Sequence, residues 1–308
     1  MLTIFSVPKA FRDHTSIIQT NAIHSWLMLR PQPEIILFGN DEGTAITASQ
    51  LGIRHVPDVQ CNEYGTPLLN SIFRTAQDIA SNPLTCYINA DIILLSDFMP
   101  AIRQIHMPSF LLIGQRWDLD LTEAIDFVNP VWEKELRARL AEKGKLHPPT
   151  GIDYFVFPRN MYAEIPAFAI GRTTWDNWLI YRARFLGIPV IDATEVVVAI
   201  HQNHGYEHLP QSAEGPWKGP ERNRNLELAG GLAHVFHLED ANRVLTRQGL
   251  KRPKPTIDRF IRYIDTLSIF HPRLGFVAKC MRDVIRLAGL ARASYRKATK
   301  FFGMKQWR

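Results

Sequence analysis

The chain has 308 residues, of which 46% are hydrophobic, so it is long enough to bury a sizeable core. Its three cysteines, Cys61, Cys86 and Cys280, have no paired spacing, which argues against a disulfide framework or a cysteine zinc site and favours a reducing compartment. No run of about 18 uncharged apolar residues is present, so the sequence predicts no membrane-spanning helix.

The net charge of +6 conceals an asymmetry between two parts of the chain. Residues 243–308 contain 17 Lys and Arg against three acidic residues, a net charge of +14, and the remainder of the chain has a net charge of −8. An acidic body with a basic tail differs from a uniformly basic protein, so the overall charge is poor support for nucleic-acid binding. We expect a main domain of residues 1–242 and a basic tail of residues 243–308, in which Pro253 and Pro255 mark a break.

Hydrophobic periodicity predicts that strands and helices alternate along the chain. The expected strands are residues 2–7, 34–38, 53–56, 84–88, 110–114, 153–157, 190–191 and 196–200. The expected helices lie between them, within residues 13–29, 44–51, 66–80, 97–105, 129–145 and 177–186, whereas residues 211–225 are typical of a loop. This alternation predicts an α/β fold with a doubly wound, mostly parallel sheet, in which ligands bind outside the carboxyl ends of the strands.

The stretch from Leu84 to Leu95 is the most informative, because an apolar run is interrupted by Asn89 and Asp91. A carboxylate directly after a buried strand is costly unless a partner neutralises it. A divalent cation that bridges Asp91 and a diphosphate would do so, since Mg²⁺-like ions prefer carboxylate and phosphate oxygens. The alternative is that the strand ends in a polar turn and that Asp91 caps the following segment.

Asn89-Ala90-Asp91 is followed well downstream by Trp175-Asp176-Asn177 and then by a strand end that carries His201 and His204. In this order, over roughly residues 1–240, the chain resembles glycosyltransferases of the GT-A fold, the nucleotide-diphospho-sugar transferase superfamily. Asn89-Ala90-Asp91 stands where that family has its D-x-D motif, with Asn in place of the first acid. The resemblance implies transfer of a sugar from a nucleotide-sugar donor to the hydroxyl of a glycan or lipid-linked acceptor.

By this resemblance, Asp91 would coordinate Mn²⁺ or Mg²⁺ held by the diphosphate of the donor, and Asn89 would contact the ribose or the metal. Such a cation stabilises the charge that develops on the leaving diphosphate. Because the neutral amide of Asn89 holds a cation less strongly than a carboxylate, metal dependence needs a direct test. His201 or His204 would be a further metal ligand or a phosphate contact, and the alternative for both is a solvated turn.

Two carboxylates are candidates for the general base that takes the proton from the acceptor hydroxyl. The resemblance favours Asp176, which lies in a Gly/Trp-rich segment before a helix, although Asp176 would also suit the cap of that helix. Asp153 is the rival base or an acceptor-binding residue. Trp175 and Trp178 would stack on sugar faces or belong to the core.

The ends of the first two strands are the natural cradle for the nucleotide of the donor. Ser6 and Pro8 would line the base, and Asp41 would hold the base or the ribose. Asn70 and Arg74, one helical turn apart, would reach the base or the phosphates, and an exposed helix charge is the alternative for Arg74.

Residues 256–308 combine apolar stripes with basic side chains and terminal aromatic residues, a pattern typical of an interfacial helix on an anionic membrane. The alternative is that this tail docks on the acidic main domain, and no recognised module supports nucleic-acid binding. The apolar run at residues 3–7 is too short for a signal peptide. We therefore expect a cytoplasmic protein that associates peripherally with the inner face of the membrane.

Two other functions are compatible with the sequence. A GT-A-like nucleotide-sugar binding protein would keep the cleft without turnover, and Asn89 makes this alternative worth testing. A sugar nucleotidyltransferase would have a glycine-rich phosphate loop after the first strand, but Ser6-Val7-Pro8-Lys9-Ala10 contains no glycine.

Overall fold

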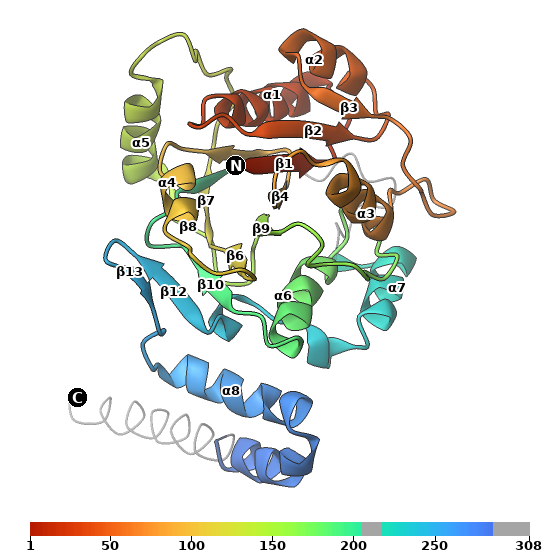
Figure 1. Cartoon of the computed structure of the whole chain (residues 1–308), viewed down its shortest axis with the longest axis vertical. Helices are drawn as coiled ribbons and strands as arrows, with labels where there is room; N and C mark the ends of the chain where they lie inside the picture. Colours follow the sequence, from red (N-terminus) through yellow and green to blue (C-terminus); the bar gives the residue numbers. More distant parts are fainter. Residues whose placement is uncertain (205–216, 286–308) are drawn as a thin grey trace, which may run out of the picture. The chain divides into compact units, whose positions relative to one another are not determined.

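The computed structural model describes residues 1–204 and 217–285, and the chain divides into two compact units, Met1–Pro253 and Lys254–Arg308. Within its described part, the first unit contains a nine-stranded sheet and a four-stranded sheet with helices around them (Figure 1). Each unit is described separately below.

The nine-stranded sheet has the strand order β13-β12-β10-β6-β9-β4-β1-β2-β3. Its neighbouring strands are parallel except at β9, which is antiparallel to β4 and β6, and at β13, which is antiparallel to β12. The expected α/β fold with a mostly parallel sheet is therefore confirmed. The strands are β1 (Leu2–Ser6), β2 (Glu34–Phe38), β3 (Arg54–Val56), β4 (Leu84–Ile88), β6 (Leu111–Ile113), β9 (Tyr154–Pro158), β10 (Val190–Asp192), β12 (Arg243–Thr246) and β13 (Gly249–Lys251).

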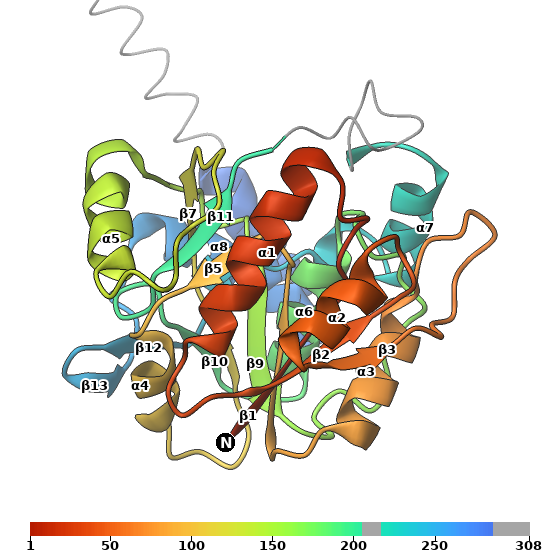
Figure 2. The same ribbon diagram turned by 90° about the horizontal axis from the view of Figure 1, so that it is seen from above.

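Helices pack on both faces of this sheet, because the central strands are apolar on both sides. On one face, Ile4 of β1 lies in a buried cluster with Trp26 of α1, and Figure 2 looks onto the side that α1 and α2 cover. On the other face, the ring of Phe73 from α3 lies 5.1 Å from that of Phe5 and 5.5 Å from that of Tyr87. The helices of the first unit are α1 (Asp13–Leu27), α2 (Thr44–Leu51), α3 (Leu69–Ile79), α4 (Phe98–Arg103), α5 (Trp132–Lys143), α6 (Trp175–Phe185) and α7 (Pro220–Leu228).

The smaller sheet has the order β5-β11-β7-β8, and two of its strands, β5 and β7, directly follow strands of the larger one. After the turn at residues 89–91, β4 continues into β5 (Ile92–Leu94), and β6 continues into β7 (Arg116–Leu119). Between them lies β11 (Ala199–Gln202), and β8 (Lys145–Leu146) forms the edge. The register places His201 of β11 opposite Ile92 on one side and Asp118 on the other. The smaller sheet thus gathers polar residues beside the carboxyl end of β4.

The structure differs from the sequence expectation in three places. The larger sheet continues past residue 242, the expected domain boundary, because β12 pairs with β10 and β13 pairs with β12. Residues 92–94 and 116–119 are strands that the periodicity did not separate from their neighbours. In the expected loop, α7 begins at Pro220, since proline fits the first position of a helix, where its missing N–H is not needed. Residues 211–216 of that loop lie outside the described residues.

The second unit begins with α8 (Ile257–Phe270), and the side chain of its N-cap, Thr256, accepts a hydrogen bond from the backbone N–H of Arg259 at 3.2 Å. A 3₁₀ turn at Pro272–Leu274 follows, and residues 275–285 are helical. The end of the basic tail, residues 286–308, lies outside the described residues. In the part of the chain that the structure describes, no helix is both long and apolar enough to cross a bilayer.

Candidate active site

Three segments of the chain meet where β4 ends, and the candidate site lies there. Asn89 and Asp91 follow β4 directly, and Asp153 precedes β9, which runs antiparallel to β4. The last ladder pair of these strands is Ile88 with Tyr154, and the backbone N–H of Asn89 then donates to the carbonyl of Asp153 at 3.0 Å. An antiparallel neighbour therefore brings Asp153 to the edge at which parallel strands place their carboxyl ends.

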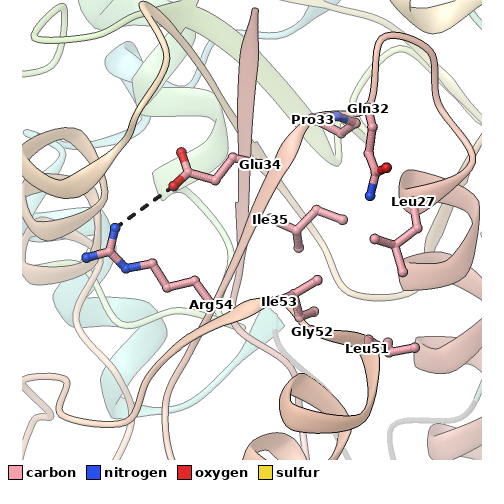
Figure 3. Close-up of a pocket in the computed structure, with 9 residues that line it drawn as sticks. All are labelled: Leu27, Gln32, Pro33, Glu34, Ile35, Leu51, Gly52, Ile53 and Arg54. Atoms are coloured by element: carbon pink, nitrogen blue, oxygen red, sulfur yellow. Dashed lines mark ion pairs between the residues drawn. The ribbon is translucent and has the colours of Figure 1, made fainter.

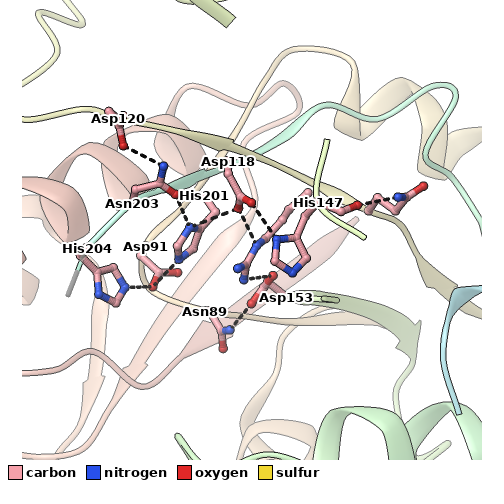
Figure 4. Close-up of polar contacts among 11 residues, drawn as sticks. Asn89, Asp91, Asp118, Asp120, His147, Asp153, His201, Asn203 and His204 are labelled. Atoms are coloured by element: carbon pink, nitrogen blue, oxygen red, sulfur yellow. Dashed lines mark hydrogen bonds and ion pairs between the residues drawn. The ribbon is translucent and has the colours of Figure 1, made fainter. Parts of the chain in front are cut away.

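Asp91 lies against two histidines from β11 and the residues after it (Figure 4). Its Oδ2 is 2.9 Å from Nε2 of His204 and 3.7 Å from Nε2 of His201. The possible ligand atoms of the three side chains all lie within 4.8 Å of one another, as required of a metal site. Within the described residues, Oδ1 of Asp91 is buried and has no hydrogen-bond partner. A buried, unpaired carboxylate oxygen beside two imidazoles is the donor set that a divalent cation would fit.

The charge states of this cluster also suit a cation. Burial alone would raise the pKa of Asp91, but the interactions with His201, His204 and Lys9 lower it below its ordinary value. Burial lowers the pKa of His201, although the charge of Asp91 opposes this shift. Asp91 is therefore ionised and His201 is neutral near pH 7, which are the forms of these side chains that bind metals.

Asp153 lies beside this cluster and is fully paired. Its Oδ1 accepts from Nδ2 of Asn89 at 2.6 Å, and its Oδ2 accepts from Nη1 of Arg116 at 2.7 Å. Nε of Arg116 also donates to Oδ1 of Asp118 at 3.0 Å, and Oδ2 of Asp118 lies 2.7 Å from Nδ1 of His147. Figure 4 shows this network running from the Asp91 cluster to His147.

Asp176, the other candidate base, occupies the first turn of α6. Thr174 directly precedes that helix and has φ of +97°, a strained conformation for a β-branched residue. Trp175 fixes the turn, since its ring packs 5.2 Å from that of Tyr87 and 5.7 Å from that of Phe155. The backbone conformation of Thr174 and the packing of Trp175 thus fix the position of Asp176.

The electrostatic setting of Asp176 differs from that of Asp153. Burial raises the pKa of Asp176 to about 6, and the charge of Asp153 adds to this shift, while backbone hydrogen bonds oppose it. In the described part of the chain, Oδ1 of Asp176 is buried without a hydrogen-bond partner. The charges of Asp91, Asp153 and Asp176 join burial in raising the pKa of Tyr87. We therefore group Asp176 with Asp91 and Asp153 in one candidate site.

The residues expected to bind the nucleotide occupy different positions. Ser6 is fully buried and its hydroxyl donates to the carbonyl of Ile88 at 2.6 Å, so it ties the ends of β1 and β4 together. Pro8 is buried in the loop after β1, and Asp41 is exposed after β2. The Ser6 hydroxyl thus serves the fold, whereas Pro8 and Asp41 stay at the strand ends where the nucleotide is expected.

Asn70 and Arg74 lie together, as their helical spacing predicts, but the pocket that they line contains none of Asp91, Asp153 and Asp176. They line a shallow pocket of about 230 Å³ with residues 162–165, and Arg74 is exposed. Residues 162–165 follow β9 at the end opposite to Asp153. No described contact joins either side chain to Asp91.

A further pocket lies at the amino ends of β2 and β3, the edge of the sheet opposite to Asp91 (Figure 3). It has a volume of about 270 Å³, and the ion pair between Glu34 and Arg54, at 3.9 Å, crosses one side. None of the predicted site residues lines it.

Sequence reasoning missed several members of the site. Arg116 and Asp118 lie on β7, a strand that the periodicity did not reveal, and His147 follows the two-residue strand β8. Lys9 interacts electrostatically with Asp91 and with Arg172, and nothing in the spacing of these residues indicates it. One signal was available, because Gln115-Arg116-Trp117-Asp118 directly follows an expected strand, as Asn89 and Asp91 do.

No known protein-family profile matches the chain, and no curated protein matches it. Solved structures do: glucosyl-3-phosphoglycerate synthase from Mycobacterium tuberculosis, in complex with phosphoglyceric acid, is 17% identical, with 76% of this chain and 80% of that chain covered and a TM-score of 0.44. The mannosyltransferase PcManGT from Pyrobaculum calidifontis, in complex with GDP-Man and Mn²⁺, is 12% identical, with 67% and 59% covered and a TM-score of 0.41.

Proposed function

We propose that the chain is a glycosyltransferase that uses a nucleoside-diphosphate sugar and a divalent cation. The observation that carries this proposal is the cluster of Asp91, His201 and His204, whose ligand atoms lie within 4.8 Å of one another after β4. Ligands of parallel α/β sheets bind at this edge, and the buried, unpaired Oδ1 of Asp91 faces no protein donor in the described chain.

Asp91, His201 and His204 would hold the cation. Bound there, it would stabilise the negative charge that develops on the leaving diphosphate. Two imidazoles and one carboxylate suit Mn²⁺ better than Mg²⁺, which prefers oxygen ligands alone. We therefore expect Mn²⁺ to support higher activity than Mg²⁺ at equal concentration.

Asp176 is the proposed general base. The acceptor hydroxyl oxygen attacks the anomeric carbon of the donor sugar while its proton passes to the Asp176 carboxylate. The bond from the anomeric carbon to the phosphate oxygen breaks, and its electron pair leaves with the nucleoside diphosphate. A base with a pKa of about 6 is ionised at neutral pH and can still accept a proton. Asp153 is a poor base, because both of its oxygens already accept hydrogen bonds.

The nucleotide of the donor would lie at the ends of β1 and β2, near Pro8 and Asp41. Lys9 supports this position for the diphosphate, because it is a cation within electrostatic reach of Asp91. A phosphate between Lys9 and a cation held by the Asp91 cluster would interact with positive charge on both sides.

A donor-turnover assay tests the proposal. Wild type, Asp91→Ala and Asp176→Asn are incubated with Mn²⁺ and a panel of UDP- and GDP-sugars, and release of nucleoside diphosphate is measured with water or added glycans as acceptors. Glu34→Gln at the opposite sheet edge is the control. Turnover that is lost in both site variants and kept in the control supports the proposal. Nucleotide binding without turnover by wild type would favour the non-catalytic alternative.

For the second unit, we propose an anionic bilayer surface as the partner, at the cytoplasmic face of a membrane. Exposed apolar side chains are spaced along its helices, with exposed fractions of 71% for Ile257, 54% for Phe260, 59% for Tyr263 and 77% for Phe276. Residues 254–308 contain 13 Lys and Arg against three Asp. Apolar side chains beside an excess of positive charge bind anionic lipid headgroups.

Vesicle sedimentation tests this partner on the full chain. Wild type should sediment with phosphatidylserine-containing vesicles and less with phosphatidylcholine vesicles, and Phe260→Ala with Phe276→Ala should weaken the binding. Val128→Ala is the matched control, since Val128 is 91% exposed in the first unit. Equal sedimentation with both vesicle types, or an unchanged double variant, would contradict the proposal.

A further inference from the structure

The hydrogen bond between Asn89 and Asp153 fixes the orientation of an amide beside Asp91 (Figure 4). An ionised carboxylate only accepts hydrogen bonds, so the NH₂ group of Asn89 must face Oδ1 of Asp153, at 2.6 Å. Oδ1 of Asn89 then points away from Asp153 as an acceptor. Asn89 is only partly buried, and no described residue donates a hydrogen bond to this oxygen.

Asp153 can orient the amide of Asn89 because other side chains fix the position of Asp153 itself. It is 6% exposed, and Nη1 of Arg116 donates to its second oxygen at 2.7 Å. Arg116 is fixed in turn by Asp118, at 3.0 Å, and Asp118 by His147, at 2.7 Å. The largely buried guanidinium of Arg116 donates to the buried carboxylate of Asp153, so the charge of this carboxylate is paired.

We propose that Arg116 and Asp153 are positioning residues that orient the Asn89 amide, so that its side-chain oxygen accepts a hydrogen bond from a hydroxyl of the donor. This inference rests on the proposed function. It also assigns the negative charge of the pair to position 153 instead of position 89. Asn at position 89 is then a requirement of the pair and not a weakened acid of the D-x-D motif.

The hydrogen bond between Asn89 and Asp153 limits which residues can replace either side chain. Asp at position 89 would bring a second carboxylate to 2.6 Å from Oδ1 of Asp153, and the two like charges would repel. Restoring the acid of the motif should therefore harm the site. Exchanging the two residues, Asn89→Asp with Asp153→Asn, rebuilds one amide and one carboxylate, and Arg116 can still donate to the amide oxygen at position 153.

The test measures donor binding and turnover in Asn89→Asp, Asp153→Asn and the exchanged double variant. Binding of UDP, GDP, UDP-glucose and GDP-mannose is measured by calorimetry with Mn²⁺ present. Each single variant should lose about 10- to 100-fold in donor affinity, as for other residues that orient a ligand group. The double variant should regain at least about tenfold over Asn89→Asp. Asn160→Asp, the same change at an exposed position, should match wild type.

The outcomes separate this inference from the proposed function. Full affinity in Asn89→Asp, or no recovery in the folded double variant, overturns the positioning role even if wild type is an active transferase. The predicted order of affinities without any turnover supports the positioning role and overturns the transferase proposal. A wild-type chain that binds none of the four nucleotides overturns both. Loss of affinity for UDP or GDP themselves identifies a ribose hydroxyl, and loss only for the nucleotide sugars identifies a sugar hydroxyl.

Discussion

Two kinds of carboxylate belong to the candidate site, and they differ in how completely they are paired. Asp153 accepts hydrogen bonds at both oxygens, from Asn89 and Arg116. Asp91 and Asp176 each keep a buried Oδ1 that no described residue contacts by a hydrogen bond. An unpaired buried oxygen costs free energy, and a bound ligand would compensate that cost. We therefore expect the paired carboxylate to shape the site and the two unpaired ones to act on the substrate.

The largest effect is expected at Asp176. Asp176→Asn removes the group that accepts the proton, so kcat should fall by about 10²- to 10⁴-fold. The melting temperature should not fall, because the amide replaces a carboxylate whose ionised form burial disfavours. Steady-state kinetics and thermal unfolding check both expectations. Asp58→Asn at an exposed position is the control, and full activity in Asp176→Asn would contradict the base assignment.

Asp91→Ala should lower the Mn²⁺ affinity inferred from activation curves by at least about 100-fold, since it removes the only carboxylate of the cluster. The measurement is donor turnover as a function of Mn²⁺ concentration. Asp120→Ala nearby, which removes the acceptor for Asn203 at 2.8 Å, should change this affinity much less. Equal Mn²⁺ dependence in wild type and Asp91→Ala would show that the cation binds elsewhere.

The role of the paired carboxylate, Asp153, is tested by measuring the free energy of unfolding. Arg116→Met leaves the charge of Asp153 buried without its ionic partner, which should lower the free energy of unfolding by about 3–5 kcal/mol. Urea denaturation measures this loss. Arg137→Met, which breaks the more exposed pair with Asp97 at 2.7 Å, should cost about 1 kcal/mol or less. If the two variants lose the same stability, the buried pair has no special structural role.

The pH dependence of activity and of stability should reveal the role of Asp176, one of the unpaired carboxylates. Because Asp176 must be ionised to act, kcat/KM should rise as the pH passes through about 6 and level off above it. Stability has the opposite sign: a raised pKa in the folded chain stabilises the fold below the ordinary carboxyl pKa, and this contribution is lost as the pH rises from 3.8 to about 6. Asp176→Asn should lack both changes. A wild-type profile that is flat between pH 5 and 7 would contradict the assignment.

The smallest effect is expected at the opposite edge of the sheet. Glu34→Gln alters a side chain bonded to Thr3 and Ser81, at 2.6 and 2.9 Å, so it should lower the free energy of unfolding by about 1 kcal/mol. Its kcat/KM should stay equal to that of wild type. A large loss of activity would mean that the pocket of Figure 3 takes part in function.

The sequence predicts the fold well where apolar periodicity is strong. The strands that become β1, β2 and β4 are short apolar runs between helical patterns, and their order alone indicates a parallel sheet. It fails at β7 and β8, because strands of two to four residues with mixed polarity have no detectable period. The pairing of β12 with β10 is a contact across the fold that no local pattern encodes.

The site is predictable in part for the same reason. Asp91, His201 and His204 are visible as polar residues at strand ends, so their meeting could be expected. The position of Arg116 after an expected strand was visible, but its partner was not, because the antiparallel strand β9 carries Asp153 into reach. The unequal pairing of Asp153 and Asp176 also depends on three-dimensional contacts, whereas the sequence offered only a resemblance that favours Asp176 as the base, with Asp153 as its rival.

Thermal unfolding with a panel of nucleotides, four nucleoside diphosphates and CMP, tests the central claim most directly. Wild type and Asp91→Ala are melted with UDP, GDP, ADP, dTDP and CMP, each with and without Mn²⁺. A ligand at a hundredfold excess over its dissociation constant adds about 2.7 kcal/mol to the stability of the fold that binds it. We predict that one nucleoside diphosphate stabilises wild type only when Mn²⁺ is present, and that Asp91→Ala abolishes this shift. An equal shift without Mn²⁺ or in Asp91→Ala, or no shift with any nucleotide, would contradict the claim that this cluster binds a metal and a diphosphate.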